Sequence, residues 1–199
     1  MNDINFPAGI LQAPFYDPNA SDAENYGHIG AIVGHELTHG FDDQGSQFDG
    51  YGNLSGWWSA DDRKKFDAMT DCEVQEYGNF TAVADVKLNG KLELGENTAD
   101  NGGLRLAYLA FLADAKRKNI DLNAKQGGYT PQQQFFLAFG QNWCGSRRPE
   151  MVRLLVQTDG HAPEQFRANG VVQNLPAFGE AFGCKVGQPM MPVNACHIW

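Results

Sequence analysis

The sequence has little positive charge and no basic run. Its 199 residues include 15 lysines and arginines against 24 aspartates and glutamates, for a formal net charge of −9. Nucleic-acid binding depends on cationic side chains that neutralise phosphates, so this deficit argues against a nucleic-acid partner. The hydrophobic content of 42% is ordinary, and the length suffices for one domain, residues 1–199, with a substantial core.

Long hydrophobic runs are missing too. The longest unbroken apolar stretch, residues 106–113, is far shorter than the roughly 20 residues that cross a bilayer as a helix. The first residues show no charged segment followed by a hydrophobic one. We therefore expect no transmembrane segment, signal peptide or anchor within this chain.

Cysteines are few and widely spaced. The four of them have no C-x-x-C spacing, which argues against a cysteine-ligated zinc site. An even number in an exported protein favours disulfides. The alternative is four buried small hydrophobic residues in a reducing compartment.

What the sequence does contain is a histidine pair with an acid between its members: His35, Glu36 and His39. Residues four apart share a helix face, so both imidazoles can reach one metal ion. Glu36 can then act on a water at the open metal position, as in H-E-x-x-H zinc peptidases. A lone histidine pair is more often a surface feature. Here the preceding residues 27–34 are apolar and small, which predicts a buried helix where unpartnered imidazoles would be costly.

Two acidic residues, Glu96 and Asp100, have the same spacing further along the chain. Glu96 is predicted to be the third ligand, which leaves the fourth position for water. Asp100 can accept the far N–H of His35, and Asp42, one turn after His39, can do the same for that ring. The alternative is two solvated carboxylates at a helix N-terminus. Beside the histidine pair the metal interpretation is favoured, because the site is otherwise one ligand short.

The pattern of caps and breakers predicts a mainly helical domain with a very small β component. A tight hairpin is expected over residues 88–92, because Asn-Gly suits a two-residue turn. Two short helices are expected to begin at Pro163 and Pro176, and another opens at Pro149. The longer helices are expected at about 21–42, 59–77, 96–118 and 131–143.

Several separated motifs then occur in a fixed order. They are FPAGILQ (6–12), HELTHGFD (35–42), ENTADNGG (96–103), WCG (143–145) and CHIW (196–199). In these motifs the chain resembles the C-terminal catalytic part of the neprilysin and endothelin-converting-enzyme family of zinc metallopeptidases. The resemblance implies a thermolysin-like, gluzincin-type fold and one Zn²⁺ per chain, held by His35, His39 and Glu96.

The family's reaction gives three further residues expected roles. Glu36 should take a proton from the attacking water and pass it to the leaving amine. The resemblance implies that His161 stabilises the oxyanion and that Arg167 grips a backbone carbonyl of the substrate. Outside that motif context both would be interpreted as solvated surface residues.

Apolar candidates for gripping a hydrophobic substrate side chain are Phe15, Ile32 and Trp143. An aromatic residue in a helical domain is more often core than pocket, so this assignment competes with a structural one. Two other histidines, His28 and His197, lack any motif context and are expected to be structural.

The resemblance also implies the cysteine pairing. Cys72 should bond to Cys196 and tie down the C-terminal tail. Cys144 and Cys184 match positions that bond, in relatives, to cysteines of a large N-terminal region, so they are either free thiols here or bonded only in a longer chain. We therefore expect a longer protein that carries that region.

The function expected from these observations is zinc-dependent endopeptidase activity on oligopeptides, on the N-terminal side of hydrophobic residues. An extracellular, cell-surface or periplasmic location is expected with it. Relatives carry an Asn-Ala segment along the bound peptide, just before the Phe6-Pro7 motif, and this sequence lacks it. Two alternatives follow: a metal-binding domain that is weak or silent without its N-terminal region, and a peptide-binding domain without turnover.

Overall fold

A computed structural model of the chain describes residues 2–198, so Met1 and the Trp199 of the C-terminal motif lie outside the described residues. The fold is mainly helical, as predicted, with one two-stranded sheet among the described residues. Its elements are the short helices η1 (Ala8–Ile10), η3 (His39–Phe41) and η4 (Gly45–Gln47), the π-turn η2 (Tyr26–Gly30), the helices α1 (Asp22–Asn25), α2 (Ala31–Thr38), α3 (Ala60–Asn79), α4 (Leu94–Lys118), α5 (Pro131–Gln141), α6 (Pro149–Thr158), α7 (Glu164–Val172) and α8 (Pro176–Phe182), and the strands β1 (Thr81–Val83) and β2 (Val86–Lys87).

Helix boundaries follow the capping residues closely. Ser21 and Glu24 form a capping box at the start of α1, and Thr130 with Gln133 forms another at the start of α5. The predicted helix over 21–42 is present as one helical path from α1 through η2 and α2 to η3. The helix expected to reach Trp143 ends at Gln141 instead.

The predicted hairpin over residues 88–92 is wrong. The strands pair earlier, with Thr81 opposite Lys87 and Val83 opposite Val86, and the turn contains Ala84 at φ 47°. Gly90 instead lies against α3, where an added Cβ would meet the Val74 carbonyl oxygen at 2.3 Å. The glycine is needed for this close approach rather than for a left-handed turn. Its segment forms a turn that leads directly into α4.

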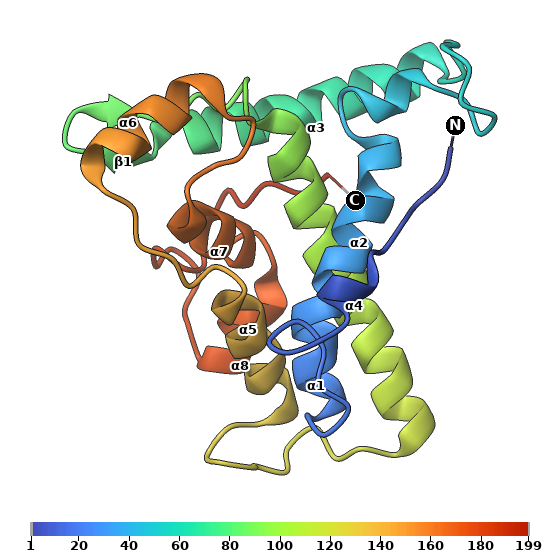
Figure 1. Cartoon of the computed structure of the whole chain (residues 1–199), viewed down its shortest axis with the longest axis vertical. Coiled ribbons are helices and arrows are strands. Elements are labelled where there is room, and N and C mark those ends of the chain that lie inside the picture. Colours follow the sequence, from blue (N-terminus) through green and yellow to red (C-terminus); the bar gives the residue numbers. More distant parts are fainter. Residues whose placement is uncertain (1, 199) are drawn as a thin grey trace.

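The crossing of α2 and α4 positions the residues of the candidate site. The two helices run side by side in Figure 1. They touch through glycine: a Cβ on Gly34 would meet the Gly103 carbonyl oxygen at 2.5 Å, and one on Gly103 would meet the His35 amide nitrogen at 2.4 Å. Backbone therefore packs directly on backbone. This contact brings His35 of α2 and His39, the first residue of η3, over the acidic residues at the start of α4.

Two apolar clusters support this crossing. The larger one contains stacked and T-shaped aromatic rings from α4 and α5, including Tyr108, Phe111, Phe135 and Phe136. The smaller one includes Tyr77 and Phe166 and lies under the hairpin. No helix of the described residues is long and apolar enough to span a membrane.

Helix α3 is fastened to its surroundings in two ways. Cys72 forms a disulfide with Cys196, as predicted, with 5.7 Å between the Cα atoms. The other two cysteines bond to no described residue. Glu73 is fully buried and accepts a hydrogen bond from the Thr98 hydroxyl at 2.9 Å. Burial raises the pKa of Glu73 to about 8.

Candidate active site

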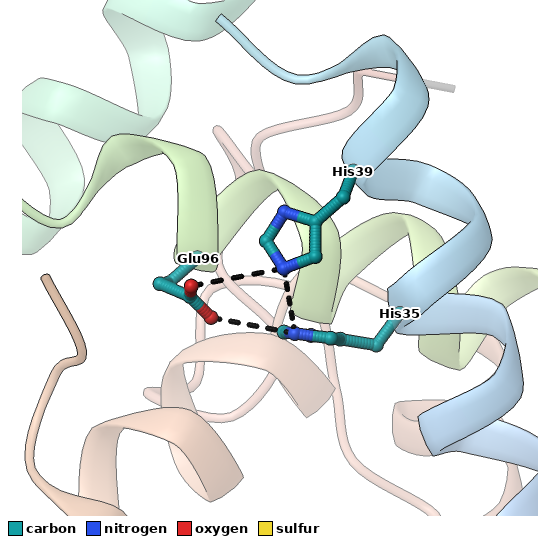
Figure 2. A group of neighbouring side chains, drawn as sticks. All are labelled: His35, His39 and Glu96. Carbon is teal, nitrogen blue, oxygen red and sulfur yellow. Dashed lines mark hydrogen bonds and ion pairs between the residues drawn. The ribbon is translucent and has the colours of Figure 1, made fainter. Parts of the chain in front are cut away.

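Three side chains converge where α2 crosses the start of α4 (Figure 2). The Nε2 atoms of His35 and His39 lie 3.0 Å apart. Glu96 places one carboxylate oxygen 3.3 Å from the first of these nitrogens and the other 3.7 Å from the second. Their ligand atoms all lie within 4.8 Å of one another. Two imidazoles and one carboxylate are the donor set of a catalytic zinc site with an open fourth position.

The hydrogen bonds on the far side of both rings support a cation at this point. His35 Nδ1 lies 2.7 Å from Asp100 Oδ1, and His39 Nδ1 lies 2.7 Å from Asp42 Oδ2. A carboxylate accepts, so each Nδ1 carries the proton and each neutral Nε2 presents a lone pair. Two lone pairs facing each other at 3.0 Å repel unless a proton or a metal ion lies between them. The residues present therefore fit zinc.

The pKa values of the cluster residues, considered without a metal ion, also favour a positive charge at this point. Burial lowers the pKa of His35, but hydrogen bonds to Asp100 and Glu96 outweigh it and raise the value to about 9. Burial opposes ionisation of Glu96, yet His161 and His35 hold the pKa of that carboxyl well below its usual range. The cluster therefore favours a positive charge at its centre, which a proton supplies when zinc does not.

Asp100 connects the cluster to α7. It is 3% exposed, and besides His35 it accepts hydrogen bonds from Arg167 Nε at 2.6 Å and Nη2 at 2.7 Å. The side chain of Arg167 is 13% exposed, so it is not the ordinary surface arginine of the alternative interpretation. Its guanidinium carbon lies 4.1 Å from the ring centre of Trp143, a cation–π contact.

His161 reaches the cluster from the turn before α7. Its Nε2 lies 3.1 Å from Glu96 Oε2, and its Nδ1 lies 2.8 Å from Asp159 Oδ1. The hydrogen bond to Glu96 raises the pKa of His161 against the effect of burial. Sequence reasoning gave Asp159 no role. Its position two residues before His161, where its carboxylate also accepts that residue's backbone N–H at 3.0 Å, was the available signal.

A cavity of about 280 Å³ opens beside these residues. All three apolar candidates, Phe15, Ile32 and Trp143, line it, and the exposed side chain of Glu36 borders it. Lining residues not expected from the sequence are Ala31, Phe139 and Asn142. Phe139 lies one helical turn before Trp143, a spacing that offered a signal, whereas nothing in the sequence indicated Asn142.

Two crossing helices with an H-E-x-x-H pair on one and a Glu-x-x-x-Asp pair on the other define the gluzincin-type zinc peptidases as the structural class. The chain belongs to peptidase family M13, whose family model matches residues 1–198.

Curated relatives and solved structures agree with this assignment. The chain is 45% identical to neprilysin-1 of Caenorhabditis elegans and 46% identical to endothelin-converting enzyme 1 of Bos taurus. Each match covers 100% of this chain, but only 27% and 26% of the relative. The inhibitor complex of Mycobacterium tuberculosis zinc metalloprotease Zmp1 superposes with a TM-score of 0.86 at 41% identity, over 90% of this chain and 28% of that one. The chain thus spans about a quarter of the length of these relatives.

Proposed function

We propose that this chain supplies the catalytic centre of a zinc-dependent endopeptidase that cuts oligopeptides on the N-terminal side of hydrophobic residues. The observation that carries the proposal is the His35–His39–Glu96 cluster at the edge of an apolar-walled cavity bordered by Glu36. Zinc bound there would supply a Lewis acid that lowers the pKa of a bound water toward neutrality.

The chain's own residues divide the remaining work. Glu36, at the cavity border, accepts the proton of the attacking water and returns it to the leaving amine. His161 is held by Asp159 through Nδ1, and when its imidazole is protonated Nε2 carries a hydrogen as well. That Nε2–H, which faces Glu96, would donate to the oxyanion that forms at the substrate carbonyl. Arg167 uses Nε and Nη2 on Asp100, and its remaining N–H groups can donate to a backbone carbonyl of the substrate.

The cavity walls account for the preference for hydrophobic residues. Phe15, Ile32 and Trp143 face a space of about 280 Å³ beside the cluster. An apolar substrate side chain that enters it leaves water, and this burial provides binding energy. A charged side chain packed against these three apolar residues would lose its hydration without gaining an ionic partner from them.

The test is Glu36→Gln in protein shown to be fully loaded with zinc. An amide cannot accept the proton, so turnover of a fluorogenic peptide should fall by about 10²–10⁴-fold while zinc content is unchanged. Glu150→Gln is the matched control, because it makes the same change at an exposed residue in the first turn of α6. Turnover retained in the Glu36 variant would refute the proton-transfer role. A zinc-loaded native chain that cleaves nothing would favour the silent metal-binding alternative.

An exported location is proposed with this function. The Cys72–Cys196 disulfide supports it, because such bonds persist in oxidising compartments. Trapping thiols in intact cells before lysis tests it. A fully reduced pair under those conditions would contradict an exported location.

A further inference from the structure

One polar contact lies between the walls of the cavity and has no role in the proposed chemistry. His28 belongs to the π-turn η2, directly before the helix that carries the histidine pair, and is 8% exposed. Its Nδ1 lies 2.6 Å from Asn142 Oδ1, although the two residues are 114 positions apart in sequence. Asn142 also donates from Nδ2 to the carbonyl oxygens of Gly27 at 3.2 Å and His28 at 3.4 Å.

These three contacts fix the orientation of both side chains. Because Asn142 Nδ2 faces two carbonyl oxygens, its Oδ1 must be the acceptor, so His28 Nδ1 carries a proton. A π-turn shifts the hydrogen-bond ladder of a helix and is frequent at functional sites. The Asn142 side chain therefore holds this turn by bonding both to the His28 ring and to two backbone carbonyl oxygens of the turn.

The turn also packs directly on α5. A Cβ on Gly27 would meet the Phe135 carbonyl oxygen at 2.2 Å and the Ala138 Cβ at 2.9 Å. The backbone of η2 and the backbone of α5 are thus in contact, and the His28–Asn142 pair closes the C-terminal end of that contact.

The pair connects the two walls of the cavity. One wall is α2, which contributes Ala31 and Ile32, and the other is the end of α5 with the turn that follows it, which contribute Phe139 and Trp143. Asn142 itself lines the cavity, between these two aromatic residues in sequence. The distance between the walls therefore depends on a part-buried hydrogen bond, and leaving one of its two partners unpaired is costly.

We propose that His28 and Asn142 form a positioning pair that fixes the width of the cavity and thereby sets the discrimination between large and small hydrophobic side chains of a bound peptide. The pair touches no reacting atom. The identity of the ligand as a peptide rests on the proposed function, whereas the wall-to-wall connection rests on the contacts alone.

The experiment measures peptide binding without cleavage, in zinc-loaded Glu36→Gln protein. Two peptides differ only in the residue after the cleaved bond, phenylalanine or alanine, and the ratio of their Kd values is compared. His28→Leu and Asn142→Leu should each lower the preference for phenylalanine about fivefold, the equivalent of about 1 kcal/mol for one net hydrogen bond. The double variant should lose no more than Asn142→Leu alone, because that variant already removes the interaction with His28.

Two controls separate this effect from general damage. Gln141→Leu changes an exposed residue at the same helix end and should leave the ratio unchanged. Zinc affinity should be unchanged in all variants. Neither His28 nor Asn142 has a hydrogen bond to a proposed zinc ligand or to the carboxylates that hold the ligand histidines. Additive losses in the double variant, or an unchanged Kd ratio in both single variants, would overturn the proposal.

A second readout does not need a peptide. Quenching of Trp143 fluorescence by acrylamide, assigned by subtracting the signal of Trp143→Phe protein, should increase in each single variant and increase no further in the double one. If no variant binds either peptide, the proposed function fails while this readout still decides the positioning pair. Unchanged quenching in both single variants would then refute it.

Discussion

Replacing Asp100 by asparagine should damage two properties of the chain at once. The carboxylate is 3% exposed and receives three hydrogen bonds, one from His35 and two from Arg167, at 2.6 to 2.7 Å. Asparagine has nearly the same shape but only one acceptor oxygen and no charge. Its amide group must face one of the two donors, so one contact becomes repulsive.

The magnitudes follow from burial. Removing one member of a buried ion pair costs about 3–5 kcal/mol, because the other charge is left without compensation. Arg167 is 13% exposed and retains Glu96 at 3.6 Å as a second carboxylate, so the lower end, about 3 kcal/mol, is expected here. Loss of the carboxylate behind a ligand histidine typically lowers metal affinity by about 10–100-fold.

The assay combines urea unfolding of the metal-free chain with competitive zinc titration. Asp42→Asn is the matched control: this carboxylate also holds a ligand ring, but its other contacts are the backbone N–H groups of Gln44 and Gly45. It should lower zinc affinity to a similar extent while costing only about 1 kcal/mol of unfolding free energy. Equal unfolding midpoints for the two variants would refute the argument that Asp100 compensates a buried guanidinium.

Three other outcomes are expected. Glu96→Gln should sharply lower zinc occupancy, because an amide is a poor ligand in a two-histidine, one-carboxylate site. Reducing the Cys72–Cys196 bond, which spans 124 positions, should lower the free energy of unfolding by about 2–5 kcal/mol. The pKa of Glu73, about 8 when folded against an ordinary 4.5, means that the folded chain binds the extra proton between these values. The free energy of unfolding should therefore fall as pH rises from about 4.5 to 8, and Glu73→Gln should make that fall smaller.

Each of these has a contrary result that is easy to recognise. Full zinc occupancy in the Glu96 variant, measured by metal analysis after dialysis, would remove that residue from the ligand set. An unfolding free energy that reductant leaves unchanged would show that the Cys72–Cys196 bond does not stabilise the fold. A Glu73 variant with the same pH dependence of urea unfolding as the native chain would mean that another group titrates.

Helical spacing made the cluster predictable. Each pair of residues four apart points to one side of its own helix, so local sequence sufficed to group His35 with His39 and Glu96 with Asp100. The sequence also contained the signals for most helix starts, in the form of serine, threonine and proline caps. The family resemblance alone pointed to His161 and Arg167, because neither has a local pattern that distinguishes it from a surface residue.

Contacts between segments far apart in sequence could not be predicted from local sequence patterns. Asn142 meets His28 across 114 positions, and no periodicity links the two. The hairpin was misplaced for a related reason: Asn89-Gly90 has the composition of a tight turn, but Gly90 is required by the neighbouring backbone of α3. A glycine needed for close packing and a glycine needed for a positive φ look identical in sequence.

The glycine contact between α2 and α4 has a genetic consequence. Where backbone meets backbone, no side chain can change rotamer to absorb an added methyl group, so alanine at Gly34 or Gly103 must push the helices apart. The histidines move with one helix and Glu96 with the other. A missense change at either glycine would thus produce a protein that lacks metal although every ligand is intact. Inherited or engineered variants of this kind would be identified by zinc content, not by inspection of the H-E-x-x-H motif.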